Sequence, residues 1–161
     1  MKISFGSKRI VLLTGNHAIK IGKIRLVRFV SRFFVLPFSK RLRGRFIIKY
    51  GPGWKTALFN DLFAGLMSNR NEYTYFQEDK NIHVMPTSKQ FLKGHVIIQL
   101  RGSAVSEKEI EKEFPNYKSS EYREAELNTA RQFCRHPDGK IRIADYGNIS
   151  TIHLIKETLN V

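Results

Sequence analysis

Apolar and polar positions form strand-like runs over residues 2–13, which the tetrapeptide Gly6-Ser7-Lys8-Arg9 interrupts. The turn signal Gly15-Asn16 then leads into another strand-like run over residues 17–21. This order predicts a β-hairpin followed by a third strand at the beginning of the chain.

Helical spacing replaces this pattern after residue 22. Arginines fall three and four positions apart between residues 23 and 34, which predicts an amphipathic helix whose basic stripe faces away from its aromatics. Pro37 should end that helix. After the break at Gly51-Pro52-Gly53, the apolar spacing over residues 54–76 predicts one long helix.

The remaining sequence mixes short strands and helices. Strands are predicted at 82–85 and 95–100, and Ser106 with Glu109 forms a capping box that should open a helix. The other predicted elements are a helix over 120–133, a hairpin turn at Asp138-Gly139 between strands near 133–135 and 140–144, and a helix over 150–159. We therefore expect an α+β fold in a single compact domain over residues 1–161: a five-stranded antiparallel sheet with a packed helix, then a mainly helical part with a β-hairpin.

Charge is distributed unevenly along this pattern. Residues 1–60 contain fourteen Lys and Arg and no Asp or Glu, so the whole formal net charge of +14 lies there. Such asymmetry predicts a polyanionic partner, namely nucleic acid, an acidic protein or an anionic membrane surface. The alternative is a basic surface that only aids solubility. The candidate polyanion-binding residues are Arg25, Arg28, Arg32, Arg41, Arg43 and Arg45.

Composition excludes several other kinds of chemistry. The single cysteine, Cys134, rules out an internal disulfide and a cysteine-based zinc site, and it fits a reducing compartment. No apolar run reaches the roughly 18 residues of a membrane span, and no signal-peptide core is present, so we expect a cytoplasmic protein. The five histidines form no ligand spacing typical of metal hydrolases, and neither a complete Walker loop nor a nucleophile elbow occurs.

Three short motifs lie in an order typical of nucleotide chemistry. Ala18-Ile19-Lys20 lies on the third predicted strand, Glu72 lies on the long helix, and the apolar run 141–144 ends in Asp145-Tyr146-Gly147. This order resembles the protein-kinase-like superfamily, closest to small atypical branches such as lipopolysaccharide-kinase-like, RIO-like and uncharacterised bacterial or phage kinase-like proteins. The resemblance implies a small lobe over 1–102 with a basic insertion at 22–50, and a reduced large lobe over 103–161.

The resemblance also implies ATP and Mg²⁺ as cofactors and gives roles to individual residues. Lys20 would hold the phosphates, and Glu72 would orient Lys20 through an ion pair. Asp145 and Gln132 would hold the metal, and Asn128 would stand at or beside the catalytic-base position. The nucleotide itself would contact Lys8, Lys20 and the hinge that runs from Gln99 to Gly102.

Departures from the family pattern favour a degenerate member. The loop Gly6-Ser7-Lys8-Arg9 has one glycine where three are usual, although Lys8 and Arg9 could replace the lost phosphate contacts electrostatically. Asn128 is a poor base because a neutral amide does not accept the hydroxyl proton. The predicted function is therefore a pseudokinase-type protein that binds a partner through its basic N-terminal region, with or without residual ATP binding.

Two alternatives stay open. An active chain would be an atypical ATP-dependent kinase, whereas a chain without a nucleotide site would be a module that binds nucleic acid or an anionic membrane. Taken singly, each motif residue also has an ordinary interpretation: Lys20 as a solvated strand-edge lysine, Glu72 as half of a surface ion pair, and Asp145 as a turn residue.

Overall fold

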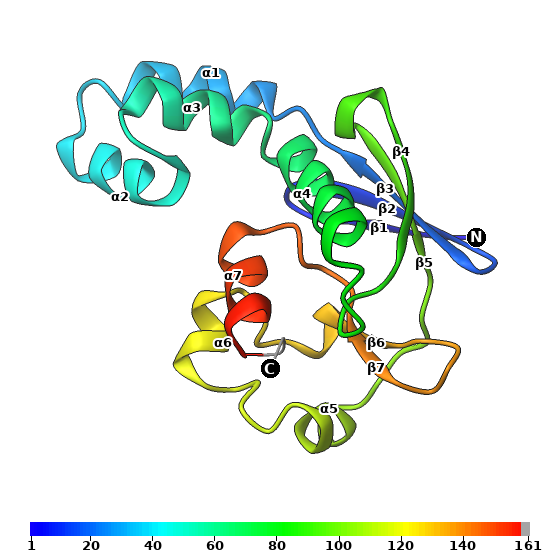
Figure 1. Ribbon diagram of the computed structural model, residues 1–161. Helices are drawn as coiled ribbons and strands as arrows, with labels where there is room; N and C mark the ends of the chain where they lie inside the picture. The colour runs from blue at the N-terminus through cyan, green and yellow to red at the C-terminus, as the bar shows by residue number, and fades with distance from the viewer. Residues whose placement is uncertain (159–161) are drawn as a thin grey trace.

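The computed structural model describes residues 1–158, and its first feature is a five-stranded antiparallel sheet with strand order β1-β2-β3-β5-β4 (Figure 1). The strands are β1 (Lys2–Phe5), β2 (Arg9–Thr14), β3 (His17–Gly22), β4 (Thr87–Phe91) and β5 (Val96–Leu100). Neighbouring strands pair antiparallel throughout, so β3 is central, between β2 and β5. The α+β class and the five-stranded antiparallel sheet are thus confirmed.

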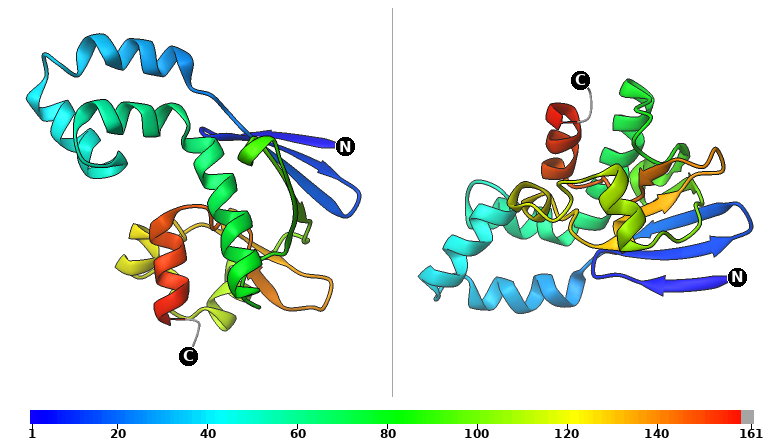
Figure 2. Two further views of the ribbon diagram at one scale, coloured as in Figure 1. Left: turned by 45° about the horizontal axis from the view of Figure 1, so that its top comes forward. Right: turned by 90° about the horizontal axis from the view of Figure 1, so that it is seen from below.

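Three helices form an arm between β3 and the helix that covers the sheet. They are α1 (Leu26–Val35), α2 (Lys40–Tyr50) and α3 (Trp54–Leu62), and we call residues 23–62 the arm. Figures 1 and 2 show the arm extending away from the sheet. Its small core contains Leu36, Phe46, Ala57 and Leu58, with Phe29, Tyr50 and Trp54 packed against it.

Helix α4 (Ala64–Asp79) lies between the sheet and the C-terminal part and contacts β3 and β4 (Figure 2). The close approach depends on glycine, because a Cβ on Gly65 would lie 2.2 Å from the carbonyl oxygen of Lys8 and 2.7 Å from the amide nitrogen of Lys23. Gly65 itself packs against Gly22 at the end of β3. This contact brings one face of α4 onto the central strands.

The C-terminal part contains α5 (Glu107–Glu113), α6 (Ser120–Glu124), α7 (Ile149–Thr158) and the hairpin of β6 (Phe133–Arg135) and β7 (Ile141–Ile143). Two short 3₁₀ turns, η1 (Leu92–Gly94) and η2 (Ala130–Gln132), connect other elements. The largest apolar core lies here and is closed by Tyr75 of α4. Its most deeply buried members include Val84, Ile110, Tyr117, Leu127, Ile143, Tyr146 and Ile155.

Several sequence predictions are confirmed at the level of elements. The first hairpin and third strand, the Ser106–Glu109 capping box and the Asp138-Gly139 hairpin are all present. The predicted helix over 23–34 is α1, and the last helix is α7, although residue 159 of that prediction lies outside the described residues.

Three predicted elements are wrong in extent or place. The long helix over 54–76 is two helices, since the chain turns at Phe63 so that α3 can pair with α1 while α4 packs on β3. The helix over 120–133 ends at Glu124, because Glu126 adopts a left-handed conformation with φ of 59°. No strand forms at 82–85, where Val84 contributes only an isolated bridge to Ile143. The strand of this region is β4, which begins two residues later, at Thr87.

Within the described part of the chain, no helix combines the length and apolar character that crossing a membrane requires.

Candidate functional site

The candidate site begins with two cations on one face of the sheet. Lys20 of β3 and Arg9 at the start of β2 are both buried, at 5% and 7% exposure. In the β2–β3 register Val11 opposes Lys20 and Arg9 opposes Gly22, so the two cations lie two positions apart on the same face. Two buried cations so close together require carboxylate partners.

Helix α4 supplies the first of these partners. The Glu72 side chain is fully buried; its Oε2 accepts a hydrogen bond from Lys20 Nζ at 2.6 Å, and its Oε1 accepts one from Arg9 at 2.5 Å. One turn earlier, Asn69 Nδ2 donates to the carbonyl oxygens of Lys20 (3.1 Å) and Gly94 (2.9 Å), which fixes α4 against the strands. The ion pair that the resemblance implied between Lys20 and Glu72 is therefore present.

The segment after β7 supplies the second partner. Lys20 Nζ donates to the carbonyl oxygen of Ala144 at 2.6 Å, and the guanidinium of Arg9 donates to the carboxylate of the next residue, Asp145. Segments more than 120 residues apart in the chain therefore meet at one point. We call Arg9, Lys20, Glu72 and Asp145 the charge cluster; it has two positive and two negative members.

Tyr146 and Gly147 hold Asp145 in place. The Tyr146 side chain is fully buried, and its hydroxyl donates to the carbonyl oxygen of Met85 and contacts Thr87 Oγ1, both at 2.8 Å. A Cβ on Gly147 would lie 2.2 Å from the carbonyl oxygen of Ser68 on α4. The Asp-Tyr-Gly sequence is therefore anchored on two sides, and the position of Asp145 follows from packing.

Burial and the neighbouring charges act in opposite directions on the members of the charge cluster. Partial burial opposes ionisation of Asp145, but Arg9 and Lys20 lower its pKa to about 2. Burial also acts against the charge on Arg9, yet Glu72 and Asp145 raise the pKa of Arg9 above its ordinary value. For Lys20 burial dominates, and its pKa is lowered despite the attraction of Glu72. Asp145 is the member nearest solvent, since 54% of its side chain remains exposed.

Other predicted site residues lie away from the cluster or are engaged elsewhere. The Gln132 side-chain oxygen accepts hydrogen bonds from the amide and hydroxyl of Thr129, both at 2.9 Å. Asn128 is exposed, Lys8 lies 3.8 Å from Glu126, and Gln99 is buried with its amide directed at the carbonyl oxygen of Met85. Gly102 packs on Cys134, where a Cβ would lie 2.7 Å from the thiol sulfur.

The predicted Mg²⁺ ligands do not fit a metal ion in this arrangement. The Asp145 carboxylate is paired with Arg9, and the Gln132 amide is held by Thr129. Among residues 1–158 no group of three or more His, Cys, Asp or Glu side chains is arranged to bind a metal ion. Mg²⁺ prefers several oxygen ligands in near-octahedral geometry, which these two side chains do not provide.

Arg9 is the cluster residue that the predicted site residues did not include. The only signal available in the sequence was the basic pair Lys8-Arg9 in a loop where glycines were expected. Which of the two cations points inward depends on the register of β2 against β3, and that register became visible only in the fold.

The arm places the six predicted polyanion-binding arginines in two different settings. Arg28 and Arg32 lie on α1, and Arg25 directly precedes it. All three form ion pairs with Asp61 of α3, whose side chain is 1% exposed. Arg41, Arg43 and Arg45 of α2 form no ion pair with any carboxylate of residues 1–158. The assignment of all six to a polyanion stays a prediction, and only the α2 group is free of an internal competitor.

Comparisons of the chain with protein-family models, with characterised proteins and with solved structures give no match.

Proposed function

We propose that this chain is a kinase-like protein that does not transfer phosphate and that works by binding a partner through its arm. One observation carries the first half of the proposal: the Arg9 guanidinium lies between Glu72 and Asp145. In a phosphate-transfer site of this type, the helix carboxylate orients the strand lysine and the aspartate faces a metal. In this chain the guanidinium of Arg9 lies beside both the helix carboxylate, Glu72, and the aspartate, Asp145.

The hydrogen bonds of the cluster support the same conclusion. Lys20 Nζ already donates to Glu72 and to the Ala144 carbonyl oxygen, so its donors are largely used inside the protein. An incoming phosphate would have to compete for Lys20, and a metal ion would have to displace Arg9 from Asp145. The two ion pairs with Glu72 resist such exchange, because Glu72 is fully buried and removing a cation would leave its charge uncompensated.

The arm supports the second half of the proposal. Lys40, Arg41, Arg43 and Arg45 all lie on α2, and none forms an ion pair within the described residues. Free cations gathered on one projecting element attract polyanions over a distance of about one Debye length.

Thermal unfolding with and without Mg²⁺-ATP tests whether the charge cluster binds nucleotide. We expect no rise in melting temperature beyond that caused by Mg²⁺-tripolyphosphate, which carries similar charge without a base and reports binding to the arm. At a nucleotide concentration 100 times the Kd, binding would stabilise the fold by about 2.7 kcal/mol. A change of that size gives a rise in melting temperature that this measurement resolves. A nucleotide-specific rise that disappears in Asp145→Asn would overturn the proposal.

A matched pair of variants sharpens the result. Arg9→Ala removes the cation that lies between the two carboxylates, whereas Lys8→Ala removes its neighbour, whose ion pair is with the exposed Glu126 at 3.8 Å. If Arg9 is what blocks the site, only Arg9→Ala should gain any response to Mg²⁺-ATP. A response already present in the native chain and unchanged by both variants would show that Arg9 has no such role.

A further inference from the structure

Helix α1 is amphipathic, but its arginines face the protein, together with Phe29, which packs on the core of the arm. Arg25 donates to the buried Asp61, and Arg28 and Arg32 of α1 point to the same carboxylate, with Arg32 also stacked on the ring of Phe46 at 4.5 Å. No residue of α1 is buried. A helix of a water-soluble domain normally turns its apolar stripe inward, so this orientation needs an explanation.

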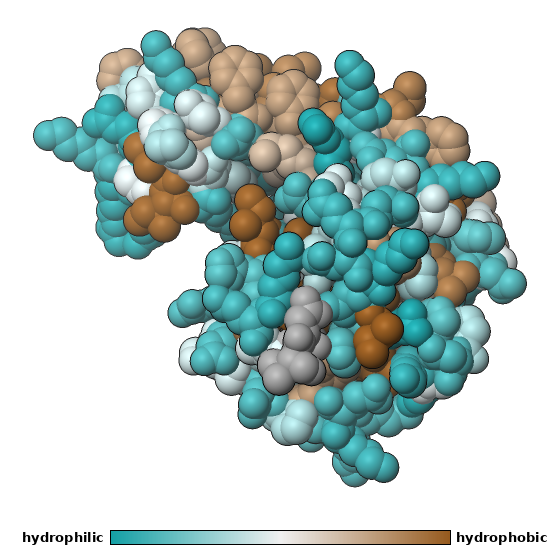
Figure 3. All heavy atoms as spheres, viewed as in Figure 1, coloured by the Kyte–Doolittle hydropathy of each residue, from teal (hydrophilic) through white to brown (hydrophobic). Residues whose placement is uncertain are grey.

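The opposite side of α1 presents a continuous apolar surface. Residues 26, 27, 30, 33 and 34 recur at helical spacing on that side, and Phe38 follows just after the helix. We call them the apolar face; their exposures are Leu26 61%, Val27 86%, Val30 48%, Phe33 48%, Phe34 67% and Phe38 89%. Brown and tan side chains line the upper edge of the molecule over α1 in Figure 3. Exposed apolar patches of several hundred Å² usually mark interaction sites.

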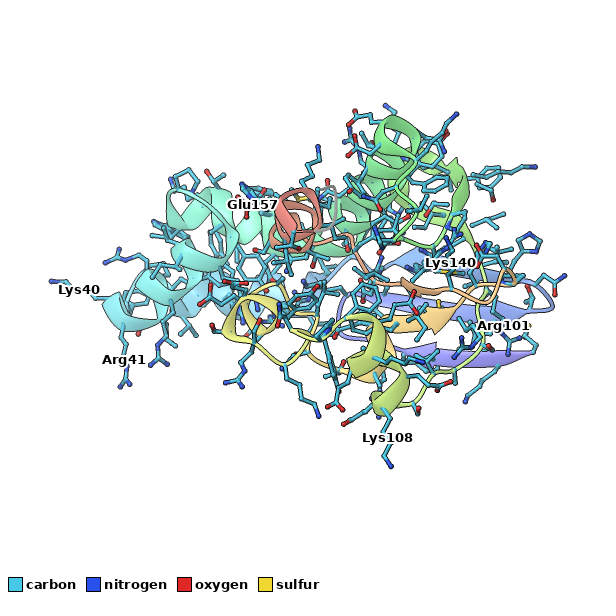
Figure 4. The ribbon with its side chains drawn as sticks, turned by 60° about the horizontal axis from the view of Figure 1, so that its bottom comes forward. Lys40, Arg41, Arg101, Lys108, Lys140 and Glu157 are labelled. Carbon is cyan, nitrogen blue, oxygen red and sulfur yellow. The ribbon has the colours of Figure 1, made fainter. Side chains whose placement is uncertain are left out.

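Cations lie at both ends of the apolar face. Phe38 is followed within three residues by Lys40 and Arg41, which point outward from the tip of the arm in Figure 4. At the other end, a shallow depression beside Leu26 and Val27 is also lined by Lys23. An apolar surface with basic ends requires an occupant that is both apolar and anionic.

We propose that the apolar face docks on the surface of an anionic lipid bilayer, with the α2 cations among the lipid headgroups. Helices that lie in the membrane interface bury an apolar stripe at the acyl boundary and draw on basic residues for attraction to anionic lipids. This inference rests on the partner-binding half of the proposed function and specifies that partner; it is independent of the charge cluster.

Charge and shape favour this occupant over the alternatives. A second copy of the chain would bring two arms of the same strong positive charge together, which is repulsive. Nucleic acid would contact the cations and could stack on the three Phe rings, but Leu26, Val27 and Val30 of the same face offer it neither stacking nor hydrogen bonds. An acidic protein would need an apolar groove of its own to receive α1. A flat bilayer surface can reach α1 directly, because the helix lies along an outer edge of the molecule, as Figures 1 and 2 show.

Vesicle flotation tests the proposal with lipid alone. The full chain is mixed with vesicles of phosphatidylcholine, or of phosphatidylcholine containing one-third phosphatidylglycerol. We expect binding to the anionic vesicles that is at least about tenfold weaker for the double variant Phe34→Ser/Phe38→Ser. The matched control, Phe91→Ser/Ile149→Ser, removes two apolar side chains that are 48% and 66% exposed elsewhere, and it should bind like the native chain.

Trp54 gives an independent readout. It is the only tryptophan, and its ring centroid lies 6.3 Å from that of Phe33 on α1. Docking of the apolar face should therefore shift Trp54 emission to the blue and allow quenching by brominated acyl chains. Because both double variants change only exposed positions, circular dichroism should be unchanged and a loss of binding can be read directly.

Three results would overturn the inference: no binding to anionic vesicles, equal binding by the Phe34/Phe38 variant, or vesicle binding without any response of Trp54. A failed vesicle assay combined with salt-sensitive binding to an RNA duplex or a polyglutamate peptide would retain the partner-binding arm and reject the lipid. A nucleotide-specific thermal shift, in contrast, would reject the proposal that the charge cluster does not transfer phosphate and would leave the vesicle result unaffected.

Discussion

Glu72 balances two cations from different strands and has no access to water. Lys20 and Arg9 each donate to one of its oxygens, at 2.6 and 2.5 Å. Asp145 shares Arg9 but is half-exposed, so it contributes to the cluster from the solvent side. Glu72 is therefore the main buried counter-charge of both Lys20 and Arg9.

Substitution of that side chain should be costly. Glu72→Gln keeps the shape but leaves Lys20 and Arg9 without their buried counter-charge, so we expect the free energy of unfolding to fall by about 3–5 kcal/mol. Urea denaturation measures this change. Glu126→Gln, which removes an exposed carboxylate near Lys8 and Lys49, should cost no more than about 1 kcal/mol. If Glu72→Gln lowered the free energy of unfolding by less than about 1 kcal/mol, the Glu72 carboxylate would not be what holds the charge cluster together.

Asp145 should make its own contribution at acid pH. Its pKa is lowered from 3.8 to about 2 in the folded chain, so its stabilising effect is complete above the unfolded value and is lost as the pH falls through the folded value. The free energy of unfolding of the native chain should therefore decline between about pH 4 and pH 2, and the decline should be smaller in Asp145→Asn. Denaturation at the two pH values measures the difference. Identical declines would show that Asp145 does not titrate with the fold.

At the scale of elements, the contact between α4 and β3 brings Glu72 to Lys20. It depends on glycine facing glycine, since Gly65 and Gly22 allow the helix backbone to approach the end of the strand. If α4 moved outward, Glu72 would leave Lys20, and the Asp-Tyr-Gly segment would lose its contact with Ser68.

Two glycine variants separate this contact from helix propensity. Gly65→Ala should destabilise the fold by about 1–3 kcal/mol, because its Cβ would collide with the backbone of Lys8 and Lys23. Gly44→Ala in α2 meets no atom within 4 Å and should be neutral or stabilising by up to about 1 kcal/mol. Thermal and urea unfolding of both variants check the pair. Equal effects would mean that α4 does not depend on the close approach.

The sequence predicted elements well where the signal was local. The Gly15-Asn16 turn, the Ser106 capping box and the Asp138-Gly139 hairpin all depend on side chains within a few positions of one another, and all three are present. Predictions failed where tertiary packing decided the outcome. The turn at Phe63 follows from two helices that have different partners, a fact that apolar spacing over 54–76 does not contain.

The candidate site shows the same division. The resemblance implied the ion pair between Lys20 and Glu72, which is present, and Asp145 lies beside it through Arg9. Arg9 could not be assigned, because its direction depends on strand register. The orientation of α1 was equally inaccessible: helical spacing separates arginines from apolar residues, but the buried carboxylate of Asp61 decides which side faces inward.

At the scale of the whole molecule, the charge of +14 is therefore not one uniform surface. Arg25, Arg28 and Arg32 neutralise a buried acid and stabilise the arm, whereas Arg41, Arg43 and Arg45 are free to meet a partner. The two sets have equal charge and equal size, so exchanging each for glutamine changes the net charge by the same amount. Any difference between the two triple variants must come from location.

We expect the two triple variants to fail in different ways. Replacing the α1 set with glutamine should leave Asp61 uncompensated, lower the melting temperature and speed tryptic cleavage within the arm several-fold. Replacing the α2 set should leave the melting temperature within about 2 °C of the native value but flatten the salt dependence of binding to anionic vesicles, since fewer cations meet the headgroups. Limited proteolysis and vesicle binding at two salt concentrations measure both effects. If both variants lost stability alike, the α2 cations would also be structural, and attraction to the partner would have to come from other cations.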